Sequence, residues 1–329
     1  MEELKEIASV LLKEEIDRLE LEKTIQKYTS LVLKASELDI ESIETTNDVY
    51  LKNGKAIGTK WAALCLEDDV RTQKFIKGLY LAIEKKRLNS HAPIRIIYAG
   101  TGPFATLILP LLPLYTPNEI QVILMEINET TAEQVKKVIS YFNFEEYIQE
   151  LIIGDAANYT FNHNQQADIV ISETMQRALD EEPQVAVTIN IVSQMKKEVI
   201  FIPQRINLFA ALIDPTTISN TDASYLKAAL AFDLDTEVIL HNTSLFKQYA
   251  TTRFPSKTIH FNRQDIQQFN HLAFFTEIQV FQDLKILPFE SGLTLPRILE
   301  NLSVYEKDVR IETYYKADKH PQLVYRVIE

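Results

Sequence analysis

The chain has 329 residues and a formal net charge of −12 at pH 7, and 46% of its residues are hydrophobic. That length suits one large or two ordinary domains, and the acidic balance argues against nucleic-acid binding while it favours a cationic partner. Cys65 is the only cysteine, so an internal disulfide and a thiolate metal cluster are excluded and a reducing, cytoplasmic setting fits. No charge-free apolar run reaches membrane-spanning length, and the first residues do not form a signal peptide, so we expect no membrane contact.

The first part of the chain is expected to be a helical segment, residues 1–58. Apolar residues recur near helical spacing between residues 3 and 37, and a polar stretch with Gly54 and Gly58 then predicts a loop or a short hairpin. Thr59 can cap the next helix, which begins near Trp61. We expect Trp61 to be a core or interface anchor rather than a catalytic group.

A second helix follows, with an apolar stripe between residues 66 and 83. Asp68 and Arg71 stand three residues apart, so they share one face of this helix. One interpretation is a surface ion pair that contributes little to stability. In the other, the helix covers a cofactor and the planar guanidinium of Arg71 holds a carboxylate.

Residues 94–128 show the pattern of a nucleoside-binding strand–helix–strand unit. An apolar run ends at Gly100, and Gly100 and Gly102 allow a sharp turn close to a ligand. Pro103 is placed to open a helix whose N-terminus would face that turn. The next apolar strand ends at Glu126, where an acid can accept hydrogen bonds from a ribose diol. The dinucleotide pattern also fits this turn, so the motif alone does not separate NAD from other nucleoside cofactors.

Three further strands are expected in this unit, residues 59–203. The third strand, 151–153, leads into Asp155 and Ala156, where an acid can accept the amine of an adenine or simply stabilise a turn. The fourth, 167–171, leads into Glu173, and the fifth covers 199–202. Alternating strands and helices predict a doubly wound parallel sheet, which binds ligands beyond the carboxyl ends of its strands. Gly100, Glu126, Asp155 and Glu173 all fall at such ends.

The pattern changes after Pro203. Alternation of apolar and polar residues, as in Val309, Ile311, Thr313 and Tyr315, predicts an antiparallel β domain over residues 204–329. The histidines are scattered and show no pair at metal-ligand spacing, so we expect no metal site.

Glu173 and Glu182 fall in one predicted loop. An acid beside a helix N-terminus is favoured by the helix dipole, which explains Glu182 without any function. An acid that ends an apolar strand, as Glu173 does, is costly unless it meets a cation. Two carboxylates held together stabilise a bound cation, and a guanidinium presents the matching fork of donors.

With these features the sequence resembles the protein arginine methyltransferases, a class I S-adenosylmethionine-dependent family. Four stretches carry the likeness: residues 66–72, residues 99–102 with Glu126, residues 172–175 with Glu182, and residues 200–205. The resemblance implies a Rossmann-like methyltransferase sheet followed by an antiparallel β-barrel-like domain, and a homodimer. It implies S-adenosyl-L-methionine as cofactor, Glu173 and Glu182 as catalytic residues, and Asp68 and Met175 as substrate-binding residues. The cofactor-binding residues that it implies are Arg71, Tyr98, Gly100, Thr101, Gly102, Glu126, Asp155 and Ala156.

The sequence also departs from the family. Tyr98 lies near the position of the acid that ends the family's first strand, and Phe104 replaces a third glycine. The family's Thr-His-Trp loop should fall near residues 293–296, where neither histidine nor tryptophan occurs. Three acceptors therefore stay open: an arginine of a protein or peptide, a small metabolite, or none, in a silent binding module. The apolar stretch 107–112 is a candidate dimer interface or an ordinary buried helix.

Overall fold

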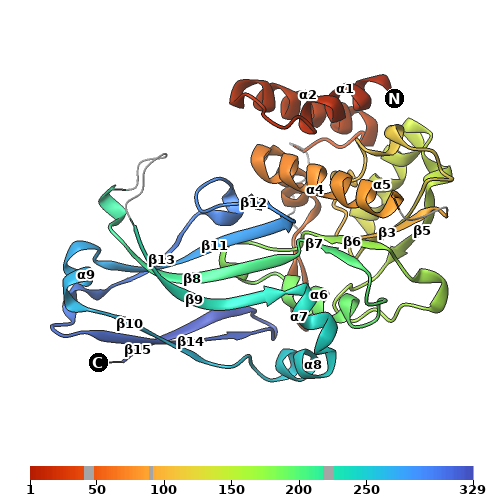
Figure 1. The fold of residues 1–329 in the computed structure, drawn as a ribbon. Coiled ribbons are helices and arrows are strands. Elements are labelled where there is room, and N and C mark those ends of the chain that lie inside the picture. Colours follow the sequence, from red (N-terminus) through yellow and green to blue (C-terminus); the bar gives the residue numbers. More distant parts are fainter. Residues whose placement is uncertain (41–47, 89–91, 218–224, 329) are drawn as a thin grey trace.

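The computed structural model describes residues 1–40, 48–88, 92–217 and 225–328 (Figure 1). Residues 41–47 of the expected N-terminal segment lie outside them. The described chain forms a mixed α/β unit with a parallel sheet and a separate antiparallel unit, which confirms the predicted fold class. No helix of the described residues has both the length and the apolar character needed to cross a membrane.

The parallel sheet is built from five short, largely buried strands. In spatial order they are β5 (Ile148–Ile153), β4 (Ile120–Glu126), β3 (Ile94–Ala99), β6 (Ile169–Ser172) and β7 (Ile200–Ile202). Because the chain runs outward from β3 to β5 and then returns to β6 on the other side of β3, the strand order reverses beside β3. A crevice at that reversal is where such sheets bind ligands. The helices that pack on the sheet are α4 (Asp69–Arg87), α5 (Glu129–Phe142) and α6 (Gln184–Val192).

The antiparallel unit follows directly after β7. One sheet contains β12 (Leu284–Ile286), β11 (His271–Phe281), β8 (Arg205–Ile213) and β9 (Tyr225–Asp235), with β13 (Arg297–Asn301) paired to β11. The other contains β10 (Lys257–Phe261), β14 (Val309–Lys316) and β15 (Gln322–Ile328). Val309, Ile311, Thr313 and Tyr315 are buried, as their alternation predicts. We call this unit the β domain. Its helices are α7 (Thr236–His241), α8 (Thr243–Thr251) and α9 (Arg263–Gln268).

Short 3₁₀ helices connect several of these elements: η1 (Cys65–Glu67), η2 (Leu112–Leu114), η3 (Glu145–Tyr147), η4 (His163–Gln165), η5 (Arg177–Leu179), η6 (Pro215–Thr217), η7 (Gly292–Thr294) and η8 (Leu302–Val304). Two of them, η5 and η7, touch each other across the boundary between the parallel sheet and the β domain.

The N-terminal segment lies against the parallel-sheet unit, with α1 (Glu2–Leu11) and α2 (Arg18–Ser36) side by side next to α4 and α5 (Figure 1). The hydroxyl of Tyr28 on α2 donates to the carbonyl of Thr106 at 2.8 Å. The apolar stretch 107–112 is buried inside the chain, so of its two interpretations burial holds and the dimer interface does not, although residues 102–111 form turns and not a helix. A hairpin of β1 (Val49–Leu51) and β2 (Gly54–Ala56) then leads to α3 (Thr59–Leu64).

Two local predictions are wrong. Residues 102–111 form successive turns rather than a helix opened by Pro103, because Ala105 has a left-handed backbone with φ 49° and Pro110 offers no N–H. Gly58, not Thr59, is the N-cap of α3, and the Thr59 hydroxyl is instead 2.8 Å from that of Thr131. Trp61 is 52% exposed, so of its two expected roles the core one is excluded and the interface one stays a prediction.

Candidate active site

The turn after β3 forms the floor of a cavity at the reversal of strand order. Gly100 and Gly102 have φ of 77° and 59°, a conformation that side chains disfavour. A Cβ at Gly100 would collide with the methyl group of Thr174, whereas one at Gly102 would meet Ala62 at an ordinary 3.7 Å. Gly100 is thus required for space as well as for backbone shape. Thr101, buried between the two glycines, also lines the cavity.

Glu126, the last residue of β4, lies buried on the same side of the cavity. Its carboxylate accepts hydrogen bonds from the backbone N–H groups of Gly102, Ile127 and Asn128, at 3.1, 2.9 and 3.0 Å. Burial raises the pKa of this carboxyl, and those backbone donors oppose the rise. The carboxylate therefore fixes the glycine turn, and its remaining lone pairs are available to a ligand.

Asp155 and Ala156 follow β5 and line the cavity beside Glu126. The Asp155 carboxylate accepts from the Ala157 backbone N–H at 2.9 Å and from the Asn158 side-chain amide at 2.6 Å. These contacts match the turn-stabilising interpretation of Asp155, and its place on the wall also allows contact with a ligand. Tyr98, on β3, is buried at the cavity wall, and burial raises the pKa of its hydroxyl.

Arg71 and Glu173 face each other across the cavity wall. Arg71 lies in the first turn of α4, Glu173 directly follows β6, and Nη2 of Arg71 pairs with Oε2 of Glu173. Both side chains are largely buried, and the other carboxylate oxygen, Oε1 of Glu173, has no hydrogen-bond partner. The cation that the position of Glu173 requires is therefore Arg71, in place of the solvent-exposed ion pair with Asp68. The sequence did not indicate this pairing, because the two residues are 102 positions apart.

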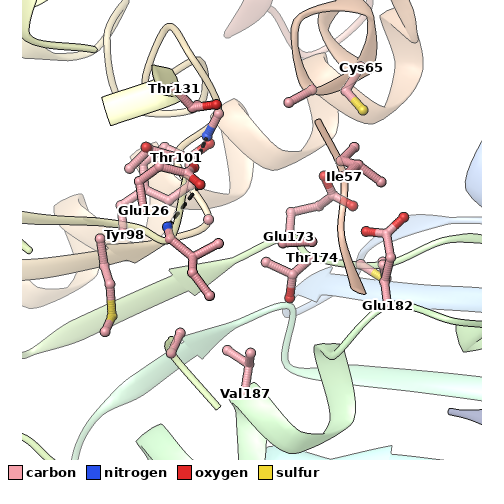
Figure 2. Close-up of a pocket in the computed structure, with 18 of the residues that line it drawn as sticks. Ile57, Cys65, Tyr98, Thr101, Glu126, Thr131, Glu173, Thr174, Glu182 and Val187 are labelled. Atoms are coloured by element: carbon pink, nitrogen blue, oxygen red, sulfur yellow. Dashed lines mark hydrogen bonds between the residues drawn. The ribbon is translucent and has the colours of Figure 1, made fainter. Parts of the chain in front are cut away.

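Glu182 lies on the same side of the cavity as Glu173, and Glu126 and Tyr98 lie on the opposite side (Figure 2). Burial raises the pKa of Glu182 to about 7, and the nearby charge of Arg71 opposes that rise. Glu182 precedes Pro183, the N-cap of α6. Glu173 and Glu182 thus share one wall of one cavity. Arg71 pairs with Glu173, and its positive charge also stabilises the ionised form of Glu182. Met175, from the same loop, is buried at that wall.

The loop from Glu173 to Glu182 holds an unusual backbone. Ala178, Leu179 and Glu181 have φ of 58°, 55° and 58°, which costs free energy for residues other than glycine. Side chains of the β domain stabilise this conformation through hydrogen bonds to the loop backbone. Thr276 accepts from the Ala178 N–H at 3.1 Å, and the Tyr315 hydroxyl donates to the Leu179 carbonyl at 2.7 Å.

Two further contacts complete this support. Arg297 of β13 pairs with Asp180 at 2.5 Å, and the carbonyl of Pro321 accepts from the Glu181 N–H at 2.8 Å. These partners come from strands and turns far along the chain, and sequence patterns gave no sign of them.

A second hollow opens beside the first and shares Ile57, Cys65, Arg71 and Glu182 with it. Its other walls include Trp61, Asp68 and Lys55. Asp68 thus lines the second hollow and not the cavity of the glycine turn. Lys55, on the β1–β2 hairpin, pairs with Asp48 and Glu181, each at 3.2 Å. The sequence predicted a loop or short hairpin around Gly54 and Gly58, but it did not indicate that this hairpin and Trp61 line the site.

Within the described residues, no group of three or more His, Cys, Asp or Glu side chains could hold a metal ion. What the cavity offers is a glycine turn, a buried acid at the end of β4, a second acid after β5, and a wall with one arginine and two glutamates. This arrangement can hold a nucleoside on one side and a cationic group on the other.

Comparison with known proteins shows which solved structures have a similar fold. No protein-family model and no curated protein matches the sequence significantly. Among solved structures, the Trypanosoma brucei PRMT1 enzyme–prozyme heterotetrameric complex with AdoHcy is similar at 12% identity and a TM-score of 0.54, over 80% of this chain and 91% of that one. Arabidopsis thaliana protein arginine methyltransferase 10 is similar at 9% identity and a TM-score of 0.54, over 80% of this chain and 96% of that one. The chain therefore has a fold of the kind seen in protein arginine methyltransferases.

Proposed function

We propose that the protein is an S-adenosylmethionine-dependent methyltransferase whose acceptor is a nitrogen atom of a cationic group, foremost the guanidinium of an arginine in a protein or peptide. The observation that carries this proposal is the wall formed by Arg71, Glu173 and Glu182 beside a glycine turn and Glu126 in one cavity. The similarity of the fold to arginine methyltransferases supports it.

The residues present fit the donor. Oε1 of Glu173 is buried in the cavity wall without a hydrogen-bond partner, so the cavity is suited to a ligand with a polar group. Glu126 would hold the ribose, Asp155 and Ala156 the adenine, and Arg71 the methionine carboxylate. At Gly100, Thr101 and Gly102 the backbone would approach the donor closely. Tyr98 would form part of the cavity wall beside it. When bound, the donor supplies an electrophilic methyl group on a sulfonium.

On the acceptor side the chain's task is to hold a poor nucleophile. The lone pairs of a guanidinium are delocalised, and methyl transfer requires one of them to be aligned with the methyl group. Glu173 and Glu182 would fix the guanidinium plane and draw its positive charge toward the nitrogens that they bind. This stabilisation grows in the transition state, so it accelerates the reaction. The carbon–sulfur bond of the donor would break as the carbon–nitrogen bond forms, and the proton that the nitrogen loses would pass to one of these carboxylates. Asp68 and Met175 would contact the incoming chain.

A small cationic metabolite is the second candidate acceptor. Neither histidine nor tryptophan occurs at residues 293–296, where the family's Thr-His-Trp loop would help to position an arginine, so a different cationic acceptor stays open. The homodimer that the family resemblance implies is also part of this proposal, with an interface other than the buried stretch 107–112.

The test has two steps. Thermal unfolding is measured with S-adenosylhomocysteine and with NAD, because a ligand that binds only the folded state raises the melting temperature. We expect stabilisation by S-adenosylhomocysteine alone; stabilisation by NAD alone overturns the proposal. Transfer of a labelled methyl group is then followed over arginine-rich peptides, histone-like proteins and a small-molecule extract, which separates the two acceptor classes.

A further inference from the structure

Asp68 is a point where the β domain touches the first turn of α4. Its Oδ1 accepts from the backbone N–H of Arg71 at 3.2 Å, so it caps the helix that carries Arg71. Its Oδ2 accepts from the Ser291 hydroxyl at 2.6 Å and from the Gly292 backbone N–H at 2.8 Å. Ser291 and Gly292 lie in the turn that begins η7, more than 220 residues along the chain.

We propose that Ser291 and Gly292 are positioning residues that hold Asp68 and, through it, hold Arg71 against Glu173. We call the contact of Ser291 and Gly292 with Asp68 the α4 latch. The inference rests on the proposed function for its catalytic consequence, because Arg71 and Glu173 belong to the proposed site. The latch itself does not depend on that function.

The contacts suit this role. Hydrogen bonds to a carboxylate are short and roughly twice as strong as neutral ones, and here two converge on a single oxygen. A Cβ at position 292 would stand 3.2 Å from Oδ2 of Asp68, so a larger residue there would require the carboxylate to move by a few tenths of an ångström. Since Asp68 caps the same turn that carries Arg71, a shift of Asp68 changes the position of the guanidinium.

The turn offers a matched control. Ser291 and Thr294 form a capping box: the Ser291 hydroxyl accepts from the Leu293 N–H at 3.1 Å, and the Thr294 hydroxyl accepts from the Ser291 N–H at 3.2 Å. Thr294→Val breaks this box without removing a donor to Asp68. Ser291→Ala breaks the box and also removes one of the two latch hydrogen bonds, that from the Ser291 hydroxyl to Asp68. The difference between the two variants therefore isolates that hydrogen bond.

Hydrogen exchange tests the latch without any activity. The amides of residues 69–75 in the full chain are compared between wild type, Ser291→Ala and Thr294→Val. We expect exchange about tenfold faster in Ser291→Ala alone, since an opening free energy lower by about 1.4 kcal/mol gives that factor. Equal exchange in both variants overturns the inference.

Turnover tests the consequence. We expect Ser291→Ala to lower kcat about tenfold while the acceptor KM changes less than twofold, and Thr294→Val to keep kcat near the wild-type value. In a double-mutant cycle of Ser291→Ala with Asp68→Ala, the losses of kcat should not add, because both substitutions remove the hydrogen bond between Ser291 and Asp68. Equal loss of kcat in both turn variants, or additive losses in the cycle, would refute the positioning role. A wild-type chain that neither binds S-adenosylhomocysteine nor methylates any acceptor refutes the proposed function instead, and hydrogen exchange then still decides the latch.

Discussion

The two halves of the cavity are built in different ways. The half with Gly100, Glu126 and Asp155 is held by hydrogen bonds to nearby chain, as in the contacts of Glu126 with Ile127 and Asn128 or of Asp155 with Ala157. The half with Arg71, Glu173 and Glu182 depends on distant partners, among them Thr276, Arg297 and Tyr315 of the β domain.

This difference has a physical consequence. A nucleoside site made from strand ends and tight turns is specified as soon as the parallel sheet forms. The wall formed by Arg71, Glu173 and Glu182, which we call the acid wall, also requires the β domain. The loop from Glu173 to Glu182 has three left-handed residues that its own sequence does not favour. We therefore expect that substitutions in the first half affect donor binding and that substitutions of Glu173 and Glu182 affect acceptor binding and turnover. Arg71, which would hold the donor's carboxylate and also pairs with Glu173, belongs to both functions.

The largest expected effect is at the acid wall. Glu173→Gln removes the charge that pairs with Arg71 and that would hold the acceptor, so we expect turnover to fall by two or more orders of magnitude, about 3 kcal/mol. Donor affinity should be roughly retained. Steady-state kinetics and calorimetry with S-adenosylhomocysteine measure the two quantities. Glu181→Gln, an exposed acid in the same loop, is the control and should stay within about twofold of wild type. Full activity in both Glu173→Gln and Glu182→Gln would end the double-glutamate hypothesis.

The second effect belongs to the other half. Gly100→Ala places a Cβ against Thr174 at a backbone angle that alanine disfavours, so we expect donor affinity to fall more than tenfold and stability by about 2 kcal/mol. At Gly102 the backbone is also left-handed, but a Cβ would make only an ordinary contact with Ala62, so Gly102→Ala should lose only about 1 kcal/mol. Calorimetry and urea unfolding compare the pair. Equal losses in both variants would show that backbone strain alone, and not the close approach to Thr174, shapes the turn.

The same division explains what the sequence could predict. The parallel sheet, the glycine turn and the gathering of Glu126, Asp155 and Glu173 at one edge followed from strand patterns and from the rule that parallel strands end at the same edge. The pairing of Arg71 with Glu173 and the contact of Asp68 with Ser291 did not follow, because they join segments whose distance in space no local pattern encodes. The choice between a core and an interface role for Trp61 was left open for a related reason: its size favours burial, but its exposure is decided by what other segments leave uncovered.

A smaller effect concerns protonation in the acid wall. Burial raises the pKa of Glu182 to about 7, above its ordinary value of 4.5, so between these values the folded state binds more protons than the unfolded state. This group therefore makes wild-type stability fall as pH rises from about 4.5 to about 7, and Glu182→Gln removes that loss. We expect the stability of Glu182→Gln relative to wild type to increase by about 1 to 3 kcal/mol between pH 5 and pH 8.

Urea unfolding at the two pH values measures this change. Asp180, whose pKa burial raises to about 6, is present in both proteins, so its contribution cancels in the comparison. Glu181→Gln serves again as the exposed control. A stability difference that is the same at both pH values would show that Glu182 is not penalised by burial, and the acid wall would then need no bound cation to balance it.

The smallest expected effect is at Trp61, in the second hollow. Trp61 is half exposed in the second hollow, close to Asp68 and Glu182, and the face of an indole attracts cations. Trp61→Ala should raise the KM of a cationic acceptor about threefold to fivefold, in line with about 0.5 to 1 kcal/mol for an exposed cation–aromatic contact. Trp61→Phe should retain most of the affinity, and donor binding should be unchanged in both, because the residue does not line the cavity of the glycine turn. If Trp61→Ala instead weakens donor binding, the two halves of the cavity are not separable at this wall, and helix α3 belongs to the donor half.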